Sequence, residues 1–306
     1  METLSSTSDV PAGTVVVGVD GSDGSARAVR WAAVEAGLTH RPLTLVNGFT
    51  VQGTVWLAEA GIDSEALAKA IRDEAATMLE KARDEALALH PDLDVRGLVV
   101  GTDARDALEE LSRSAAVLVV GSRGRGPVRS LLLGSVSVAV SKQAHCPVVV
   151  VRPGAEEATG GILVGVDGTP ASMPALEFAY REASLRQLPL TVVHCFFDVQ
   201  SAGWSAHQVP EQEISQYPDV EALVAEAMSG MQERYPDVQV ERALWRGLVD
   251  QALVLASRGR NLTVVGLRQT GPLRDLVQVP IAPAVVERAD GAVAVVPHDV
   301  DGDRDD

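Results

Sequence analysis

The segment at residues 121–137 reads GSRGRGPVRSLLLGSVS and holds residue types that could bind an anion. Gly121 and Gly124 open the segment, and Gly134 is followed by Ser135 near its end. Backbone N–H groups exposed at glycines, together with the positive end of a helix dipole, bind phosphate groups. The same residue types also build ordinary turns and helix caps. The spacing G-x2-G-x9-G-S therefore raises two hypotheses, a phosphate-binding site or a plain turn followed by a capped helix.

A second glycine turn, GVDG at residues 18–21, follows the first apolar run and is followed by Ser22. Asp20 in this turn could contact a ligand, or it could cap a helix predicted at 22–38. Both glycine turns come directly after apolar runs, and such runs predict strands. The two turns are therefore expected at the same kind of place in the fold.

Several familiar nucleotide and catalytic motifs are absent from the sequence. A Walker loop needs GxxxxGK[ST], but here Gly126 is followed by Pro127, and the three lysines of the chain are elsewhere (Lys69, Lys81 and Lys142). GVDG has the wrong spacing for the GxGxxG of dinucleotide-binding proteins, and there is no HExxH or GxSxG. The two cysteines and six histidines form no metal-binding pattern. The sequence offers binding groups without evident catalytic groups.

The chain contains an internal duplication. TVVVGVDGSDGSARAVRWAA (14–33) is repeated as ILVGVDGTPASMPALEFAY (162–180), and VLVVGSRGRGPVRSLLL (117–133) as LTVVGLRQTGPLRDLVQ (262–278). The repeats keep one order at offsets of 145 to 147 residues, which indicates two tandem domains. We predict domains at 1–154 and 162–298, a linker at 155–161 and an acidic tail at 299–306.

Each copy alternates short apolar runs with helical patterns. The first copy predicts strands at 14–20, 43–49, 94–100, 117–121 and 147–152, and a long helix at 64–89. Apolar residues with helical spacing mark that helix: Leu67, Ile71, Met78, Leu79, Ala82 and Leu89. Strands that are apolar on both faces are typical of a parallel sheet covered by helices. The fold class is therefore α/β, with two open parallel sheets of about five strands each. In such sheets ligands bind beyond the carboxyl ends of the strands, which is where both glycine turns are expected.

Composition and charge exclude some classes of function. The formal net charge is −16, so neither nucleic acid nor an anionic membrane is an expected partner. Cys146 and Cys195 lie in apolar runs of different halves and indicate small buried residues rather than a disulfide. The polar N-terminus does not resemble a signal peptide, so we expect a cytoplasmic protein.

Taken with GVDG, the string Gly121-x2-Gly124-x9-Gly134-Ser135 resembles the motif of the universal stress protein family, over residues 12–153 and 160–298. The resemblance implies a Rossmann-like fold of the adenine nucleotide alpha hydrolase-like type, often present in tandem. It also implies ATP as the ligand, alone or with Mg²⁺.

The resemblance assigns roles to particular residues of the first copy. Asp20 is expected at the adenine and ribose end, with Gly18, Gly21 and Ser22 in the same turn, while Gly48 leaves room for the base. The remaining expected contacts, to the ribose and the phosphates, come from Gly121, Arg123, Gly124, Gly134, Ser135 and Val136. In particular, a Cβ at Gly124 or Gly134 is expected to block close approach of the backbone or a positive φ.

Each assignment also has an ordinary structural explanation. Ser135 could be only the N-cap of a helix at 136–144, and the glycines could be strand-end turns. Arg123, together with Arg125 and Arg129, could be a solvated turn arginine.

The second copy serves as an internal control. Aligned without gaps, Gly124 becomes Gln269, Gly134 becomes Val279 and Ser135 becomes Pro280, while Asp167-Gly168-Thr169 keeps the first turn. The fold therefore does not need the lost glycines. We predict one ATP site in each chain, in the first domain.

The resemblance implies a regulatory stress-response protein without metabolic catalysis, which acts through ATP occupancy or slow turnover. Two alternatives stay open: an ATP-dependent hydrolase or transferase, and a nucleotide-independent interaction module. The strand VVVV at 148–151 is strongly apolar, and the resemblance implies that such a terminal strand pairs between domains or chains, so we expect pairing of the two copies and a homodimer.

Overall fold

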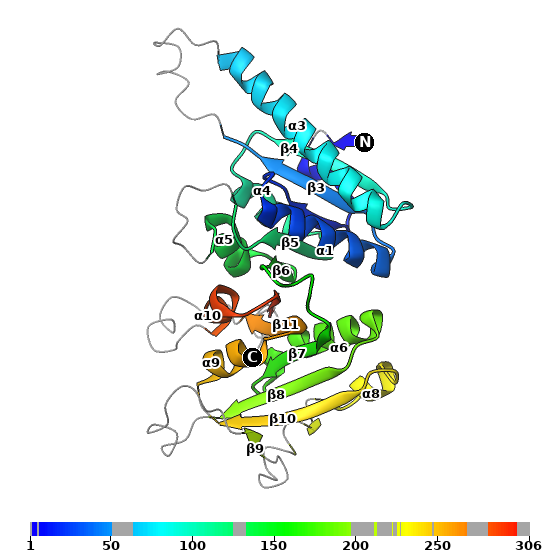
Figure 1. Ribbon diagram of the computed structural model, residues 1–306, viewed down its shortest axis with the longest axis vertical. Coiled ribbons are helices and arrows are strands. Elements are labelled where there is room, and N and C mark those ends of the chain that lie inside the picture. The colour runs from blue at the N-terminus through cyan, green and yellow to red at the C-terminus, as the bar shows by residue number, and fades with distance from the viewer. Residues whose placement is uncertain are drawn as a thin grey trace, which may run out of the picture. The chain divides into compact units, whose positions relative to one another are not determined.

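The computed structural model describes residues 2–4, 6–50, 64–124, 133–196, 211–212, 222, 225–226, 228–246, 248–267 and 281–298. The chain divides into two compact units, Met1–Val151 and Arg152–Asp306, which we call the first and second domains. Each domain is a mostly parallel sheet with helices packed on it (Figure 1). The α/β prediction is confirmed for both. The predicted acidic tail lies outside the described residues.

The sheet of the first domain has the strand order β1-β4-β3-β2-β5-β6. Its strands are β1 (Glu2–Leu4), β2 (Val15–Gly18), β3 (Leu43–Gly48), β4 (Val95–Val100), β5 (Val117–Gly121) and β6 (Val148–Val151). Strands β2 to β6 are those predicted from the apolar runs, and all the pairings are parallel. β1 was missed because three residues in a polar segment carry no strand pattern. It covers the edge of β4 and so removes an unpaired strand edge.

Helices cover both faces of this sheet. They are α1 (Asp23–Thr39), α3 (Ser64–Leu89), α4 (Ala104–Ser112) and α5 (Ser135–Gln143), and a short 3-10 helix, η1 (Thr7–Asp9), contacts α4. α1 packs beside α3, and α4 packs beside α5. As a result the β2 residues Val15, Val16 and Val17 are fully buried, as expected for a strand that is apolar throughout.

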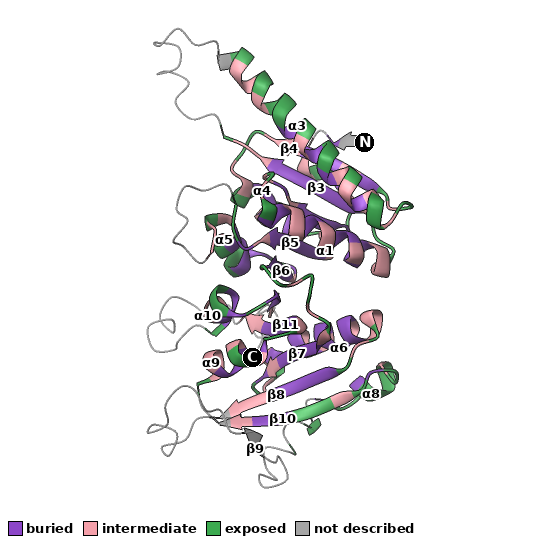
Figure 2. Cartoon of the chain, viewed as in Figure 1, coloured by how far each residue is buried: buried purple, intermediate pink, exposed green. Residues whose placement is uncertain are grey.

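Helix α3 has the bounds predicted from its pattern, but only its second half packs on the sheet. Its buried residues are Ala75, Leu79, Ala82 and Ala86. Leu67, Ile71 and Met78, which belong to the predicted apolar face, are half-buried, and Leu89 is 45% exposed. Figure 2 shows the first half of α3 almost entirely exposed or intermediate.

The second domain repeats this topology, with the strand order β12-β11-β7-β8-β10-β9. Its strands are β7 (Gly160–Val166), β8 (Leu190–Phe196), β9 (Glu211–Gln212), β10 (Val240–Arg246), β11 (Arg260–Leu267) and β12 (Ala292–Pro297). Its helices are η2 (Pro170–Ser172), α6 (Met173–Arg186), α8 (Met231–Arg234), α9 (Val249–Ala256) and α10 (Ile281–Arg288). The edge strand β10 is again covered by a short strand, here the antiparallel β9.

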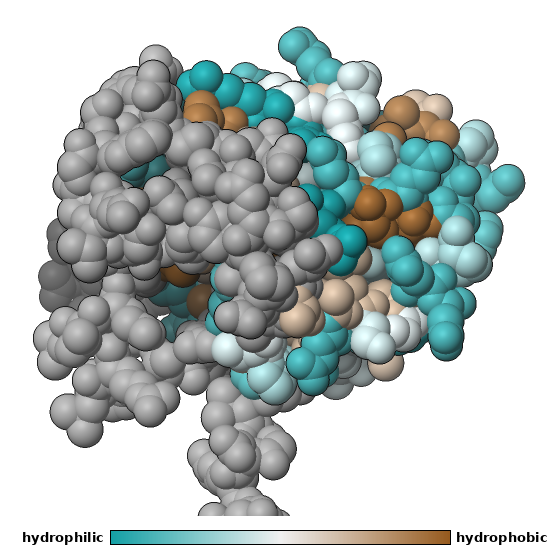
Figure 3. Space-filling model, turned by 90° about the horizontal axis from the view of Figure 1, so that it is seen from below, coloured by the Kyte–Doolittle hydropathy of each residue, from teal (hydrophilic) through white to brown (hydrophobic). Residues whose placement is uncertain are grey.

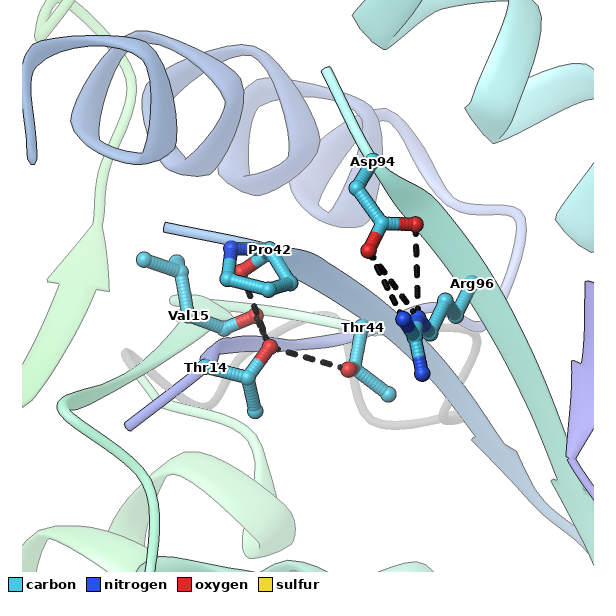
Figure 4. A network of polar contacts seen from close by, with 6 residues as sticks. All are labelled: Thr14, Val15, Pro42, Thr44, Asp94 and Arg96. Atoms are coloured by element: carbon cyan, nitrogen blue, oxygen red, sulfur yellow. Dashed lines mark hydrogen bonds and ion pairs between the residues drawn. The ribbon is translucent and has the colours of Figure 1, made fainter. Parts of the chain in front are cut away.

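The amino ends of the first-domain strands are closed by polar contacts (Figure 4). The buried Thr14 hydroxyl donates to the Pro42 carbonyl at 2.8 Å and lies 3.0 Å from Thr44 Oγ1. Beside them Arg96 is paired with Asp94 at 2.9 Å. The two buried threonine hydroxyls satisfy one another, as buried polar groups do in folded proteins, whereas the Asp94 end of the ion pair is exposed. The glycine turns lie at the opposite, carboxyl edge.

Among the described residues, no helix is both long enough and apolar enough to cross a membrane. On the face seen in Figure 3, hydrophobic residues form separate patches between hydrophilic ones.

Candidate functional site

The turn between β2 and α1 is built around Asp20. Asp20 Oδ1 accepts a hydrogen bond from the Ser22 N–H at 3.0 Å, and Gly21 between them has φ +74°. That positive φ favours glycine, because a Cβ there would be strained. Ser22, and not Asp20, is the N-cap of α1: its side chain accepts from the Ser25 N–H at 3.2 Å. The hypothesis that Asp20 caps this helix is therefore wrong, and its carboxylate lies half-buried beyond the end of β2.

Gly121 ends β5 where the first turn of α1 crosses it. A Cβ added to Gly121 would lie 2.5 Å from the carbonyl carbon and oxygen of Gly24. A Cβ added to Gly24 would lie 2.1 Å from the Arg123 carbonyl oxygen. Backbone therefore packs directly on backbone, so Gly121 is required by packing. Sequence reasoning missed Gly24, although it was visible as a second glycine in DGSDG where the other copy has Ala171.

The turn after β5 packs against Asp20. A Cβ on Gly124 would lie 2.2 Å from Asp20 Oδ2, so the turn after β5 lies directly against the Asp20 carboxylate. The Ser22 hydroxyl also donates to the Arg123 carbonyl at 3.4 Å. The structure thus brings the two glycine turns together, about a hundred residues apart in the sequence. Arg123 and Gly124 are exposed at this junction.

The second part of the G-x2-G-x9-G-S string lies at the start of α5. Gly134, not Ser135, is the N-cap, and Ser135 is the exposed first residue of the helix. The Gly134 N–H donates to the Ser122 carbonyl at 2.8 Å, which joins this turn to the end of β5. The N–H groups at the start of a helix have no partner within it, so those of Ser135 and Val136 belong to the class that binds anions.

Gly134 differs from the prediction in one respect, because its φ is −76° and a positive φ is therefore not the reason for glycine there. An added Cβ would lie 3.7 Å from Arg123 Cα, Gly124 N and Ser122 O, which is ordinary van der Waals contact. Among the residues that the structure describes, crowding does not require glycine at this position. The expectation that a Cβ would block close approach of a ligand stays a prediction.

Gly48 lies where the end of β3 meets the start of α4. A Cβ on Gly48 would lie 2.7 Å from Ala104 Cα, so this glycine lets α4 approach β3. The expectation that Gly48 leaves room for a base stays a prediction. Gly18, at the end of β2, similarly faces Leu108 and Val120, with 3.4 Å and 3.5 Å to an added Cβ.

The start of α4 carries charge to the same edge. Asp103 caps the helix, accepting from the Arg105 N–H at 2.9 Å, and also pairs with the Arg105 guanidinium at 2.6 Å. The side-chain and backbone hydrogen bonds from Arg105 lower the pKa of Asp103 to about 2, and the same pairing raises the pKa of Arg105. Both groups are therefore charged at neutral pH.

The model of the universal stress protein family matches residues 12–152 and 160–297. The chain belongs to this family. The universal stress protein Rv2623 of Mycobacterium tuberculosis H37Rv is 33% identical over 293 residues, covering 92% of this chain and 95% of that protein.

A solved structure that covers most of the chain has the same fold. A universal stress protein from Archaeoglobus fulgidus aligns with a TM-score of 0.68 at 15% identity, covering 94% of this chain and 99% of that one. A universal stress protein solved with cAMP is 31% identical and covers 46% of this chain and 98% of its own, with a TM-score of 0.36.

The second universal stress protein domain keeps the Asp turn. Asp167 Oδ1 accepts from the Thr169 N–H at 2.9 Å and from the Thr169 hydroxyl at 2.7 Å, and Gly168 has φ +76°. The next contact differs, because Ala171 stands where the first domain has Gly24. An added Cβ on Gly266, the counterpart of Gly121, would lie 3.8 Å from the Ala171 carbonyl oxygen. Gln269, Val279 and Pro280 lie outside the described residues.

The other side chains considered for chemistry are inert or structural. Burial raises the pKa of the Cys146 and Cys195 thiols to about 12, so neither forms a thiolate at neutral pH. Both cysteines are free, as the sequence predicted. Burial lowers the pKa of His194, whose Nδ1 lies 3.1 Å from the Val166 carbonyl oxygen. Within the described residues, no cluster of three or more His, Cys, Asp or Glu could hold a metal ion.

Proposed function

We propose that the first domain binds ATP, alone or with Mg²⁺, and that the protein is a regulatory universal stress protein acting through nucleotide occupancy or slow turnover. The observation that supports this most is the meeting of three segments at one edge. Asp20 lies against Gly124, and Gly134 is hydrogen-bonded to Ser122 at 2.8 Å. Segments from β2, β5 and α5 thus bring a carboxylate and the N–H groups of a helix start to one place.

Gly134 adds a separate argument. Among the described residues, which leave out 125–132, nothing requires a glycine there, since an added Cβ would meet only ordinary contacts at 3.7 Å. Absence of a side chain keeps the start of α5 open toward the exposed Gly124 and Ser135. In our proposal the phosphates lie there, against the N–H groups of Ser135 and Val136.

The remaining residues divide into two roles in this proposal. Asp20 and Ser22 face the ribose, and the exposed Arg123 supplies a positive charge beside the phosphates. Gly18, Gly21, Gly48 and Gly121 shape the backbone around the site and need not touch the nucleotide.

We propose that the second domain does not bind ATP. Val279 and Pro280 stand where the first domain has Gly134 and Ser135, and proline has no N–H to donate to a phosphate. We also propose a cytoplasmic homodimer, which light scattering of the purified chain would test by its mass.

Isothermal titration of the full chain with ATP tests the proposed site. We expect one ATP for each chain, and roughly a hundredfold weaker binding after the double substitution Gly134→Val and Ser135→Pro. Asp20→Ala should weaken binding, whereas the matched control Asp167→Ala should leave it unchanged. Two equivalent sites, no site, or full affinity in the double variant would refute the assignment.

A further inference from the structure

Helix α5 carries two buried serines that the family motif does not include. Ser137 is 3% exposed and Ser141 is 8% exposed. The Ser137 hydroxyl donates to the Gly121 carbonyl at 2.7 Å, and the Ser141 hydroxyl donates to the Ser137 carbonyl one turn earlier. The first bond leaves the helix and reaches the end of β5, whereas the second stays within the helix.

A second hydrogen bond also joins the first turn of α5 to the end of β5. The Gly134 N–H donates to the Ser122 carbonyl at 2.8 Å, so two successive carbonyls at the end of β5 hold the first turn of α5. Ser135 and Val136 lie between these two donors in the sequence. The orientation of their N–H groups relative to Gly121 and Gly124 is therefore fixed at both ends of one helical turn.

The second domain shows that the hydroxyl is not needed for the fold. At the same offset of 145 residues, Ser137 becomes Ala282 and Ser141 becomes Val286, and both of these are buried in α10. Helix α10 contacts β11 and β12 without the hydroxyl. The hydrogen bond from Ser137 is thus present in the domain that has Gly134-Ser135. The domain with Val279-Pro280 at these positions has Ala282, which cannot make this bond.

We propose that Ser137 is a positioning residue of the phosphate site: it orients the first turn of α5 and does not touch the nucleotide. Its single hydroxyl proton is already donated to Gly121, and its side chain is buried, so direct contact with a phosphate is excluded in this arrangement. This inference rests on the ATP site proposed above.

The test compares ATP and adenosine binding to the full chain and its Ser137→Ala variant. Titration calorimetry measures ATP, and ligand-observed NMR measures adenosine, which has no phosphate. We expect Ser137→Ala to weaken ATP binding about tenfold, which corresponds to ~1.4 kcal/mol, and to leave adenosine affinity within twofold. Ser137→Thr, which keeps the hydroxyl, should restore ATP affinity.

Ser141→Ala is the matched control, because it removes a buried serine hydroxyl whose bond within the described residues stays inside the helix. ATP affinity should stay within twofold in this variant. Equal losses for ATP and adenosine in Ser137→Ala, with a lowered Tm, would show a merely structural role and overturn the proposal. If the unsubstituted chain binds ATP and Ser137→Ala binds it equally well, only this inference fails. If the unsubstituted chain binds no ATP, the proposed function fails as well.

Discussion

The two domains agree in their local turns and differ where distant segments meet. In the turn after the first strand of each repeat, an aspartate accepts from the N–H two residues later, at 3.0 Å in the first domain and 2.9 Å in the second. One turn further on, Ser25 and Ser172 each donate to a carbonyl at 2.9 Å. At the crossing of the helix and the strand, however, Gly24 and Gly121 are replaced by Ala171 and a less crowded Gly266.

The two domains thus share the local turn contacts and differ in the contact between helix and strand. A turn closed by its own side chain depends on a few adjacent residues, so it survives as a unit. A close approach of two backbones depends on small residues on both sides at once. When one glycine becomes alanine, the helix must sit further from the strand, and the second glycine is no longer crowded. The tight crossing is in the first domain, next to the proposed phosphate site.

The largest stability effect should come from Gly121→Ala. Its Cβ would lie 2.5 Å from backbone atoms of Gly24, so the first domain should lose about 2 kcal/mol. Gly266→Ala in the second domain has 3.8 Å to its nearest neighbours and should change stability by less than about 0.5 kcal/mol. Hydrogen exchange with mass spectrometry measures the stability of each domain separately, because each peptide comes from one domain. Similar losses in both domains would contradict the difference in packing.

An equal effect is expected at a contact that the domains share. Ser112 accepts from the His145 N–H at 3.0 Å, and Ser257 accepts from the Asp290 N–H at 2.9 Å. Because Ser112→Ala and Ser257→Ala each remove the partner of one backbone donor, each should cost its own domain about 1.5 kcal/mol. Urea unfolding followed by hydrogen exchange should show matching shifts. Clearly different losses of stability in the two variants would show that these two hydrogen bonds are not equivalent.

A smaller, pH-dependent effect is expected at the start of α4. Asp103→Ala removes the cap and should cost about 1 kcal/mol at pH 7. Because the folded-state pKa of Asp103 is lowered to about 2 from 3.8, its contribution is complete above the unfolded-state pKa and is lost as the pH falls toward 2. The difference between Asp103→Ala and the unsubstituted chain should therefore shrink as the pH falls from about 3.8 to about 2 in urea titrations.

The second domain offers the reverse substitution at this position. Leu248 is the N-cap of α9, has no side-chain cap bond and is 50% exposed. Leu248→Asp should stabilise the second domain, by about 0.5 kcal/mol. The gain is small because Asp250 repels the new carboxylate from two residues away. A loss of stability in this variant would show that the exposed leucine contributes packing.

Much of the fold was predictable because local patterns of apolar residues in the sequence indicate its strands and helices. Continuous apolar runs gave strands β2 to β6 within one or two residues, and helical spacing gave α3 with its correct bounds. The repeat offset gave the second domain its topology. The short edge strands β1 and β9 were not predicted, because two or three residues are too few to show a strand pattern. They form only by pairing with the neighbouring strand.

For the candidate site, the sequence alone determined which turns lie at the carboxyl edge and which residues the second copy lost. Only the tertiary structure showed which contacts these residues make. Within the described part of the chain, a Cβ on Gly48 or Gly121 would meet backbone atoms, whereas one on Gly134 would meet only ordinary contacts. The N-caps are Ser22 and Gly134, and Gly24 and Ser137 contact the same edge of the sheet. The physical reason is that these roles depend on distances between backbones far apart in the chain. A difference of about 1 Å there separates a required glycine from a tolerated one, and no local pattern of residues encodes that distance.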